Sequence, residues 1–517
     1  MSANVLALPI VLPLFTGALL LLMPTPTLRT IIAAVSTAIT LTISCVIASI
    51  VFSGEVLSLQ MSAWPAPYGI TVVADSLTGI MLVLSSSVGL LTVLFLGVSL
   101  QHAPRRGSSN RLNRAREQFG AQALLQFLFM GVHMSFLTGD LFNLFVAFEV
   151  MLIASYGLIL LGSEVRQLRE GLKYVVINLL ASAVFVTTAG FAYGLLGTLN
   201  MADMAVKIQA HVAETGPDAR ITLLALLFGL VFATKAALFP LGFWLPAAYP
   251  TPPAALSAFF AALLTKVGAY TLIRSFTLIF PAEQLVRNGL FVLAAATILM
   301  GALGAVNQRR WRYLLAFANL ASIGYLIMGV MTQSNAGLGA AIFYMANSTT
   351  VMFALFLIAA IAERLTGESY YYSGHLNSYP FLSIGFFVCA LALAGLPPTS
   401  GFVGKFALIQ ALYERGDSLS TGIAIVALAG SLLLLYALIT IWRNFFWGDS
   451  DAVHREPIPL GMVITCGAAS TLVLLLTLAS GPAFEVATLT ADQLSNPEAY
   501  IEQVLSPQPD SRTAAFE

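Results

Sequence analysis

Four ionisable side chains lie inside long apolar stretches of the sequence. They are Glu149, Lys235, Lys266 and Lys405. A charged group at the depth of a membrane is costly, so such groups usually face a protein interior or a water-filled path. Carboxylates and amines both take up and release protons, and burial or a neighbouring charge changes how firmly they hold them. The four residues are therefore candidates for a proton relay.

Two of the lysines lie beside interruptions of an apolar helix. Lys235 is in VFATKAALFPLGFWLP, where Pro240 removes a backbone hydrogen bond close to the lysine. Lys405 is in LAGLPPTSGFVGKFALIQ, where Pro397 lies before the lysine. One lysine precedes its break and the other follows it, which is the order that an inverted repeat would give. Paired broken helices in the two halves of a transporter indicate its binding site.

Lys266 lies in the middle of the next apolar segment, in SAFFAALLTKVGAY. The short link AAYPTPPAA makes this segment an antiparallel neighbour of the one that holds Lys235, so both lysines could face one cavity. The alternative for each lysine is a static salt bridge. For Glu149 the alternative is an ion-paired packing residue.

Other polar residues have simpler interpretations. Asp140 follows Thr138-Gly139, so it is expected to cap a helix. His133 is expected to be a satisfied interior histidine, with a proton relay as the alternative. Asp75 is expected to be a cap or an interface residue, and Arg274 to reach toward the outer surface. Several polar side chains of the second half could hold water or pack helices: Asn319, Ser322, Asn347, Ser348 and Thr349.

The composition sets the environment in which these residues act. Of 517 residues, 58% are hydrophobic and 9% are charged, and the mean hydropathy is +0.88. Soluble domains carry about 25% charged residues, so this composition excludes a soluble protein. Net charge is zero, so nothing suggests a nucleic-acid partner. The chain is expected to be an all-α polytopic membrane protein in contact with lipid.

The apolar segments are long enough to cross a bilayer, which takes about 20 residues. The fourteen segments are 4–23, 28–53, 71–99, 119–138, 140–162, 172–197, 221–246, 252–279, 288–306, 312–331, 335–362, 381–413, 421–447 and 458–480. Loops after the odd-numbered segments hold 15 Lys and Arg residues, and loops after the even-numbered ones hold four. Basic loops stay in the cytoplasm, so both termini are expected outside.

Several kinds of chemistry have no motif here. The sequence has no GxxxxGK[ST] phosphate loop and no CxxCH, cysteine cluster or histidine pair at metal spacing. No cofactor is therefore expected, and the sequence leaves a metal site unknown. Transport energy would come from an ion gradient or from a partner.

The segments quoted above resemble the antiporter-like membrane subunits that Mrp-type cation/proton antiporters share with respiratory complex I. The resemblance also covers FNLFVAFEVMLIASYGLIL around Glu149 and RRWRYLLAFANLASIGY, and it runs from about Asp75 to the end of the thirteenth segment. The wording TGDLFNLFVAFEVML is most similar to the D-type branch of the Mrp antiporter subunits. Lys405 fits this branch, since one complex I paralogue looks to carry a glutamate there.

The resemblance implies about 14 helices with inverted repeats of helices 4–8 and 9–13 and breaks in helices 7 and 12. The implied divisions are 1–118, 119–280, 281–447 and 448–517. It implies that Glu149 and Lys235 form the coupling charge pair, that Lys266 is the central relay and that Lys405 is the far gate. Members often carry histidine or lysine in helix 11, whereas this chain has Ser348 and its neighbours there.

The hypothesis is a subunit of a bacterial plasma-membrane Na+(K+)/H+ antiporter that works with the other subunits of its complex. It would be a secondary-transporter subunit and no enzyme. One alternative is a proton-pumping subunit of complex I or of a membrane-bound hydrogenase. Another is an assembly scaffold that conducts nothing. A third is a solitary solute symporter that uses the two helix breaks as its substrate site.

Overall fold

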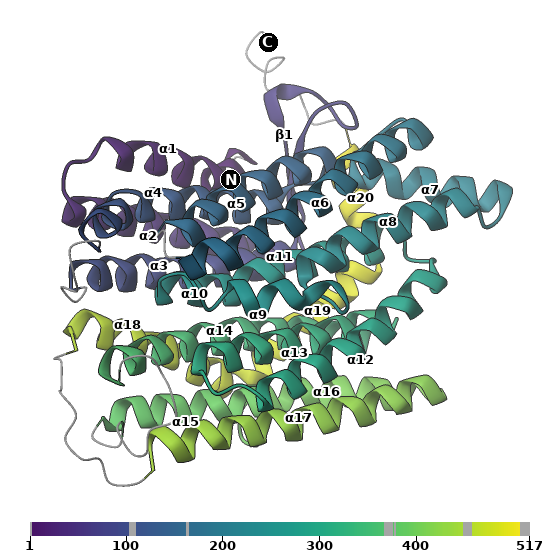
Figure 1. The fold of residues 1–517 in the computed structure, drawn as a ribbon. Helices are drawn as coiled ribbons and strands as arrows, with labels where there is room; N and C mark the ends of the chain where they lie inside the picture. Colours follow the sequence, from purple (N-terminus) through teal and green to yellow (C-terminus); the bar gives the residue numbers. More distant parts are fainter. Residues whose placement is uncertain are drawn as a thin grey trace.

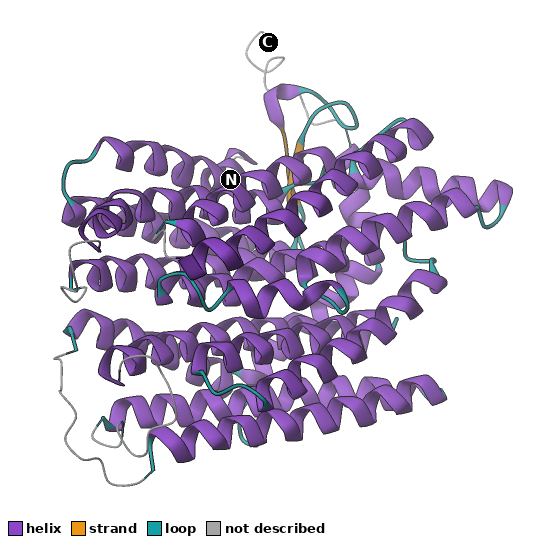
Figure 2. Ribbon diagram, viewed as in Figure 1, coloured by secondary structure: helices purple, strands orange, loops and turns teal. Residues whose placement is uncertain are grey.

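The structure is a computed structural model that describes residues 3–102, 110–161, 165–366, 376, 379–447 and 458–506. Nearly all of this part of the chain is helical, and the helices run side by side in one thick bundle (Figure 2). Arg105 and Arg106 of the predicted basic loop, and Asp510 and Glu517 of the acidic tail, lie outside the described residues.

Among the described residues, thirteen helical segments are long and apolar enough to cross a membrane. The remaining predicted segment, 381–413, is divided between the shorter helices α15 and α16, of which α15 is apolar but too short to count among the thirteen. The helices of all these segments are α1 (Leu8–Leu22), α2 (Pro26–Val51), α3 (Ser76–Gln101), α4 (Asn110–Leu137), α5 (Leu141–Leu160), α6 (Val165–Leu196), α8 and α9 (Ala219–Ala236, Trp244–Ala248), α10 and α11 (Ala254–Phe259, Thr265–Arg274), α12 (Gln284–Val306), α13 (Trp311–Met331), α14 (Asn335–Thr366), α15 and α16 (Pro380–Ala394, Ser400–Arg415), α17 (Ser418–Phe445) and α18 (Leu460–Leu478).

Smaller elements gather at one end of the bundle, which we call the hairpin face (Figure 1). They are the antiparallel strands β1 (Leu57–Gln60) and β2 (Thr71–Ala74), and the helices α7 (Met201–Thr215), α19 (Ser480–Ser495) and α20 (Glu498–Leu505). A short 3-10 helix, η1 (Ala3–Ala7), precedes α1 and packs on the strands.

The third crossing begins later than the sequence predicted. Residues 71–74 were expected to open the helix, but they form β2, and α3 starts at Ser76. Two of the four strand residues are valine and one is threonine, which favour extended backbone. The Asp75 side chain accepts a hydrogen bond from the Thr78 backbone N–H, so Asp75 caps α3 as expected.

The most buried crossings lie at the centre of the bundle. Every residue in the most apolar stretches of α14 and of the α10–α11 crossing is buried, and α13 is nearly as enclosed. In Figure 1 the helices up to α11 and the helices α12–α18 lie on opposite sides of the bundle, and the C-terminal helix α20 crosses back to α7 and β1. The buried crossings α11, α13 and α14 meet between them, so this region positions any interior site.

Both predicted helix breaks are present. Helix α8 ends at Ala236, Ala237 adopts the left-handed conformation with φ +65°, and Pro240 follows before the chain turns helical again. Helix α15 ends at Ala394, Gly395 has φ +82°, and α16 starts at Ser400 after Pro397 and its neighbours. Proline lacks the N–H that would continue each helix. At the second break the carbonyl oxygens of Leu393 and Ala394 face the Lys405 ammonium, whereas the carbonyls at the end of α8 bond to Ala237, Leu238 and Trp244.

Candidate functional site

Lys235 is held in the last turn of α8, where the helix breaks. Its Nζ donates hydrogen bonds to the carbonyl oxygen of Asn178 at 3.2 Å and to Ser182 Oγ at 3.0 Å, both on α6. The ammonium also lies 5.8 Å from the centre of the Phe148 ring. The described groups in direct contact with Lys235 are thus neutral.

Glu149 of α5 is the acidic residue expected to pair with Lys235, but the two side chains form no direct ion pair among the described contacts. Its Oε1 is buried and has no hydrogen-bond partner in the described part of the chain. An unsatisfied buried oxygen is costly, so this atom is suited to receive a water molecule or a proton.

Lys266 is held on the α13 side of α11. Its Nζ donates to the carbonyl oxygen of Ala261 at 2.9 Å and to Asn319 Oδ1 at 2.8 Å. Ala261 lies in a π-helical segment, η4 (Phe260–Leu264), whose wider turn changes which carbonyls are used inside the helix. Such π turns are frequent at functional sites. No residue pattern in the sequence indicates this turn.

The segments of Lys235 and Lys266 touch, as the short link between them predicts. A Cβ on Gly268 would lie 2.7 Å from the carbonyl carbon of Lys235, so only glycine lets α11 approach α8 there. The two ammonium groups nevertheless point to different helices, one to α6 and the other to α13. The expected single cavity with both lysines is therefore not what the side chains show.

Lys405 is held by the second break. Its Nζ donates to the carbonyl oxygens of Leu393 and Ala394, at 3.0 and 3.2 Å, and to Ser431 Oγ at 3.1 Å. It also lies 4.4 Å from the centre of the Tyr325 ring. The two carbonyls end α15, so the broken helix supplies ligands for the ammonium. Lys235, Lys266 and Lys405 are 4%, 0% and 4% exposed, so all three charges are interior.

Polar side chains on α13 connect the environments of Lys266 and Lys405. Asn319 accepts from Lys266, and Ser322 lies one turn further and accepts from Tyr344 Oη at 3.4 Å. Tyr325 comes another turn on, beneath Lys405, and its hydroxyl shares Ser431 with that lysine. Residues three apart are neighbours on a helix, so these groups form one polar row. Sequence analysis did not identify Tyr325, Tyr344 and Ser431, because nothing in the sequence distinguishes a tyrosine or serine of an interior site from any other.

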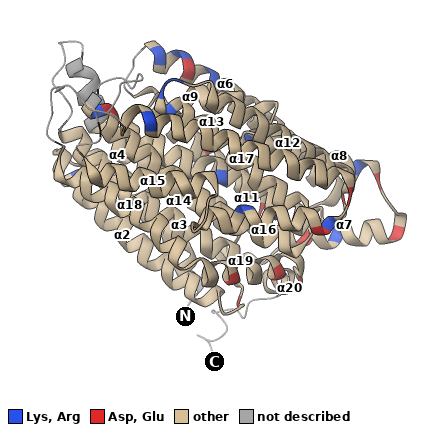
Figure 3. Ribbon diagram, turned by 90° about the horizontal axis from the view of Figure 1, so that it is seen from below, with Lys and Arg blue, Asp and Glu red and all other residues tan. Residues whose placement is uncertain are grey.

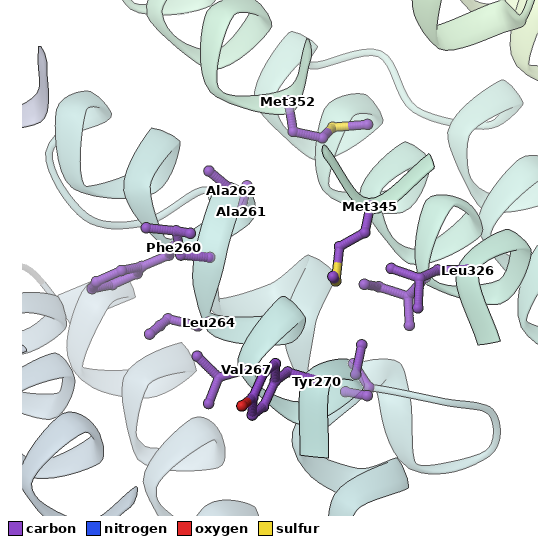
Figure 4. Close-up of a cluster of buried hydrophobic side chains, with 14 of the residues drawn as sticks. Phe260, Ala261, Ala262, Leu264, Val267, Tyr270, Leu326, Met345 and Met352 are labelled. Carbon is purple, nitrogen blue, oxygen red and sulfur yellow. The ribbon is translucent and has the colours of Figure 1, made fainter. Parts of the chain in front are cut away.

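Apolar side chains lie on both sides of η4 and α11. Figure 4 shows Phe260, Leu264 and Val267 on one side of this ribbon and Met345 of α14 on the other, and all of them belong to the buried core. Met352 of α14 is in the stretch where relatives were expected to carry histidine or lysine. Positions 345 and 352 of α14 thus offer no polar group, whereas α13 carries the polar row.

The remaining candidate residues, His133, Asp140 and Ser348, make contacts that stabilise the fold. His133 Nδ1 pairs with the carbonyl oxygen of Pro9 and its Nε2 with Ser85 Oγ, both at 2.9 Å, so this interior histidine is satisfied. Asp140 caps α5 by accepting from the backbone N–H of Asn143 at 2.8 Å, and burial raises the pKa of its carboxyl. Ser348 Oγ donates to a carbonyl oxygen of its own helix, that of Met345.

Arg274 does not reach the surface as expected. Its side chain is buried at the end of α11, and Nη1 lies 2.7 Å from Asp75 Oδ2. The expectation was wrong because Asp75, distant in sequence, lies beside it at the start of α3. Spacing along the chain cannot reveal such a pair.

Comparison with known proteins places this geometry in a family. The family described as NADH:quinone oxidoreductase/Mrp antiporter, TM matches residues 138–432. The D-type subunit of the Na(+)/H(+) antiporter of Alkalihalophilus pseudofirmus is 39% identical over 508 residues, 97% of this chain and 99% of that protein. The corresponding Bacillus subtilis protein is 38% identical, again over 97% and 99% of the two chains.

Solved structures agree. A chain of the Mrp complex from a Dietzia species has a TM-score of 0.87 and 29% identity, covering 98% of this chain and all of that chain. A chain of Thermus thermophilus respiratory complex I has a TM-score of 0.79 at 22% identity and shares the fold, covering 98% and 100%. This chain belongs to the family of D-type Na+/H+ antiporter subunits, within the larger group of NADH:quinone oxidoreductase and Mrp antiporter membrane proteins.

Proposed function

We propose that this chain is the D-type subunit of an Mrp-type Na+(K+)/H+ antiporter and that it carries protons through the membrane along Glu149, Lys235, Lys266 and Lys405. The observation that carries this proposal is the burial of three lysines, each held by neutral oxygens and none by a carboxylate in direct contact among the described residues. A purely structural lysine would be expected to have an ion-pair partner, because an uncompensated buried charge is very costly. Groups held this way can exist with or without their proton.

Coupling follows from electrostatics between the groups. When Glu149 accepts a proton, it stops attracting the Lys235 charge, which frees that lysine to pass a proton inward. Two charges about 8 Å apart at an effective dielectric constant of about 20 interact by roughly 2 kcal/mol, which is enough to change proton occupancy by more than tenfold. Lys266 then exchanges charge with Lys405 along Asn319, Ser322, Tyr344 and Tyr325, with transient water between them.

The division of the chain follows from the two breaks. We assign residues 119–280 and 281–447 to two inverted repeats, preceded by 1–118 and followed by 448–517. The order of lysine and break in α8 and α16 supports this division, since an inverted copy reverses that order. Each repeat then contributes one broken helix to the relay.

Charge distribution supports an orientation. Figure 3 shows Lys and Arg gathered at the end of the bundle near α6 and α9, and Asp and Glu at α19 and α20 on the hairpin face. Basic residues favour the cytoplasmic side. We therefore place the hairpin face and both termini outside a bacterial plasma membrane.

The working unit would be a hetero-oligomer. Cation exit, of Na+ or K+, would follow a path shared with neighbouring subunits of the complex. A complex I or hydrogenase subunit would use the same residues with electron transfer as its energy source. Mild-detergent purification of the tagged chain separates these functions: flavin or iron–sulfur proteins among its partners would contradict the antiporter.

The relay itself is tested by Lys235→Ala and Glu149→Ala in the complete complex. We expect each variant to abolish cation-dependent proton movement in everted vesicles while the complex still assembles. Lys207→Ala is the matched control, because Lys207 lies on α7 and is 41% exposed in its pair with Asp203. Normal cation-dependent proton movement by both relay variants in an assembled complex would contradict the proposal.

A further inference from the structure

A second buried charge cluster lies at the hairpin face, outside the relay described above. Its centre is the ion pair between Arg274 Nη1 and Asp75 Oδ2, 2.7 Å apart, with side chains 7% and 2% exposed. Taking two charges out of water costs free energy that their attraction often fails to recover. The pair is therefore weakly explained by stability alone.

The cluster is aligned with the central lysine. Lys266, Tyr270 and Arg274 are four residues apart on α11, so they follow one another along one side of that helix. Eight residues of α-helix span about 12 Å. The row thus leads from Lys266 to the end of α11 at the hairpin face.

Hydroxyl groups connect this row to the carboxylate. Tyr270 Oη lies 2.7 Å from the carbonyl oxygen of Phe136, to which it donates, and 3.0 Å from Thr78 Oγ1. Thr78 Oγ1 lies 3.0 Å from Asp75 Oδ1 and 3.1 Å from the same Phe136 oxygen. Each hydroxyl therefore has more than one acceptor within reach of its single proton. A proton can be passed from Tyr270 through Thr78 to Asp75 when both hydroxyls turn.

The C-terminal helices cover the cluster. The Arg274 guanidinium lies 5.0 Å from the centre of the Tyr500 ring of α20, so this ring is a second partner for its charge. Helix α20 is fastened to β1, because Ser58 Oγ donates to the carbonyl oxygen of Gln503 and Gln60 Nε2 donates to that of Val504. The cluster is thereby covered at the hairpin face by α20, which β1 holds in place.

We propose that Tyr270, Thr78 and the Asp75–Arg274 ion pair form the hairpin-face gate of the proton path, leading from Lys266 to the surface beneath α20. This inference rests on the proposed function. Arg274 keeps its proton, because a guanidinium does not deprotonate in proteins. It acts as the counter-charge, and Asp75 is the group that takes and releases the proton.

The gate has a defined sequence of proton positions. A proton leaves Lys266 Nζ, crosses to Tyr270 through water, and ends on the Asp75 carboxylate, while Arg274 turns toward the Tyr500 ring. When Lys266 takes up its next proton, its charge favours ionised Asp75, which releases its proton at the hairpin face. Positions 266 and 274 lie about 12 Å apart along the helix, and two charges at that separation and an effective dielectric constant of about 20 change a protonation equilibrium by about tenfold, which sets the scale of this coupling. The ionisable groups that face Asp75 are Arg274, Tyr270 and Tyr500.

The simpler explanation is structural. Asp75 Oδ1 accepts from the backbone N–H of Thr78 at 3.0 Å, so Asp75 would cap α3 and pin it to α11. This explanation accounts for the carboxylate and the guanidinium, and it makes the Tyr270 hydroxyl a packing contact that donates to the Phe136 carbonyl oxygen and accepts from Arg274 Nη2 at 3.2 Å. The test therefore removes hydroxyl groups and leaves the ion pair in place.

The primary variant is Tyr270→Phe in the complete complex, measured in everted vesicles as cation-dependent proton movement. Loss of one relay hydrogen bond should slow exchange by about tenfold and increase the solvent deuterium isotope effect. Tyr249→Phe is the matched control, because the Tyr249 hydroxyl is buried without a described partner. Wild-type rates and isotope effect in Tyr270→Phe would overturn the gate.

A second pair of variants separates the hydroxyl from packing. Thr78→Val keeps the shape of the side chain without its hydroxyl, and Thr78→Ser keeps the hydroxyl without its methyl group. The gate predicts slow exchange for valine and near-normal exchange for serine, whereas the reverse order would contradict it. Lys266→Met in the same assay tests the function separately: if it abolishes exchange while Tyr270→Phe exchanges normally, only the gate is wrong.

Discussion

At the residue scale, the neutral surroundings of the buried lysines are the feature that most needs a functional explanation. Lys405 has three oxygen acceptors and an aromatic ring around its ammonium, yet no carboxylate in contact among the described residues. Carbonyls at a helix break stabilise the charged form, and they remain satisfied by water when the amine is neutral. A lysine in this setting suits proton transfer.

Lys405→Arg separates charge from proton transfer. Arginine keeps the positive charge but does not deprotonate, so we expect cation-dependent proton movement to fall to background. Lys207→Arg, at the exposed position on α7, should leave the rate of proton movement unchanged. The measurement is the initial rate of vesicle pH change, and a Lys405→Arg complex with normal rates would show that position 405 carries only charge.

Tyr325→Phe tests the polar row on α13. The change leaves the ring under Lys405 and removes the hydroxyl that shares Ser431 with it. We expect exchange to slow by about tenfold, the factor of one lost hydrogen bond. The control is Tyr249→Phe, and equal rates for the two variants would argue for a route that avoids Tyr325.

At the element scale, broken and closely packed helices decide where these groups lie. The breaks could be predicted, because Pro240 and Pro397 remove backbone donors at known positions. The helix caps at Asp75 and Asp140 could also be predicted, because an acidic residue before an apolar segment favours the start of a helix. The π turn beside Lys266, η4 (Phe260–Leu264), could not be predicted, because no residue pattern in the sequence indicates it.

Gly268→Ala tests the contact between α8 and α11. A Cβ there would lie 2.7 Å from the Lys235 carbonyl carbon, and backbone atoms cannot move aside cheaply. We expect a loss of about 1–3 kcal/mol of stability together with reduced exchange. Gly190→Ala in α6 is the control, since nothing lies within 4 Å of its Cβ position. Thermal denaturation of the purified complex measures the stability of both variants. Equal melting temperatures for Gly268→Ala and Gly190→Ala would contradict the close approach of α11 to α8.

At the scale of the whole molecule, composition alone indicated the class of protein, while the contacts between halves needed the structure. Hydropathy located the thirteen long apolar helices of the described residues, because a membrane helix can be recognised from one continuous segment. The Asp75–Arg274 pair and the α20 cover join residues from distant parts of the chain. No periodicity or local motif encodes such contacts.

The proposed orientation is tested by labelling single cysteines in a cysteine-free variant. Thr215→Cys at the hairpin face should react with a membrane-impermeant maleimide in intact cells, and Arg309→Cys should react only after the cells are opened. The physical reason is the excess of basic residues at the Arg309 end. Labelling in the opposite order would place the hairpin face in the cytoplasm.

The most direct test of the account compares Lys266→Met with Lys207→Met in the purified, complete complex reconstituted into liposomes. Methionine keeps much of the length of lysine and removes its charge and proton. If the chain carries protons, Lys266→Met abolishes cation-driven proton movement in an assembled complex, and Lys207→Met behaves as wild type. Undiminished proton movement with Lys266→Met would contradict the relay and leave the chain as a non-conducting scaffold.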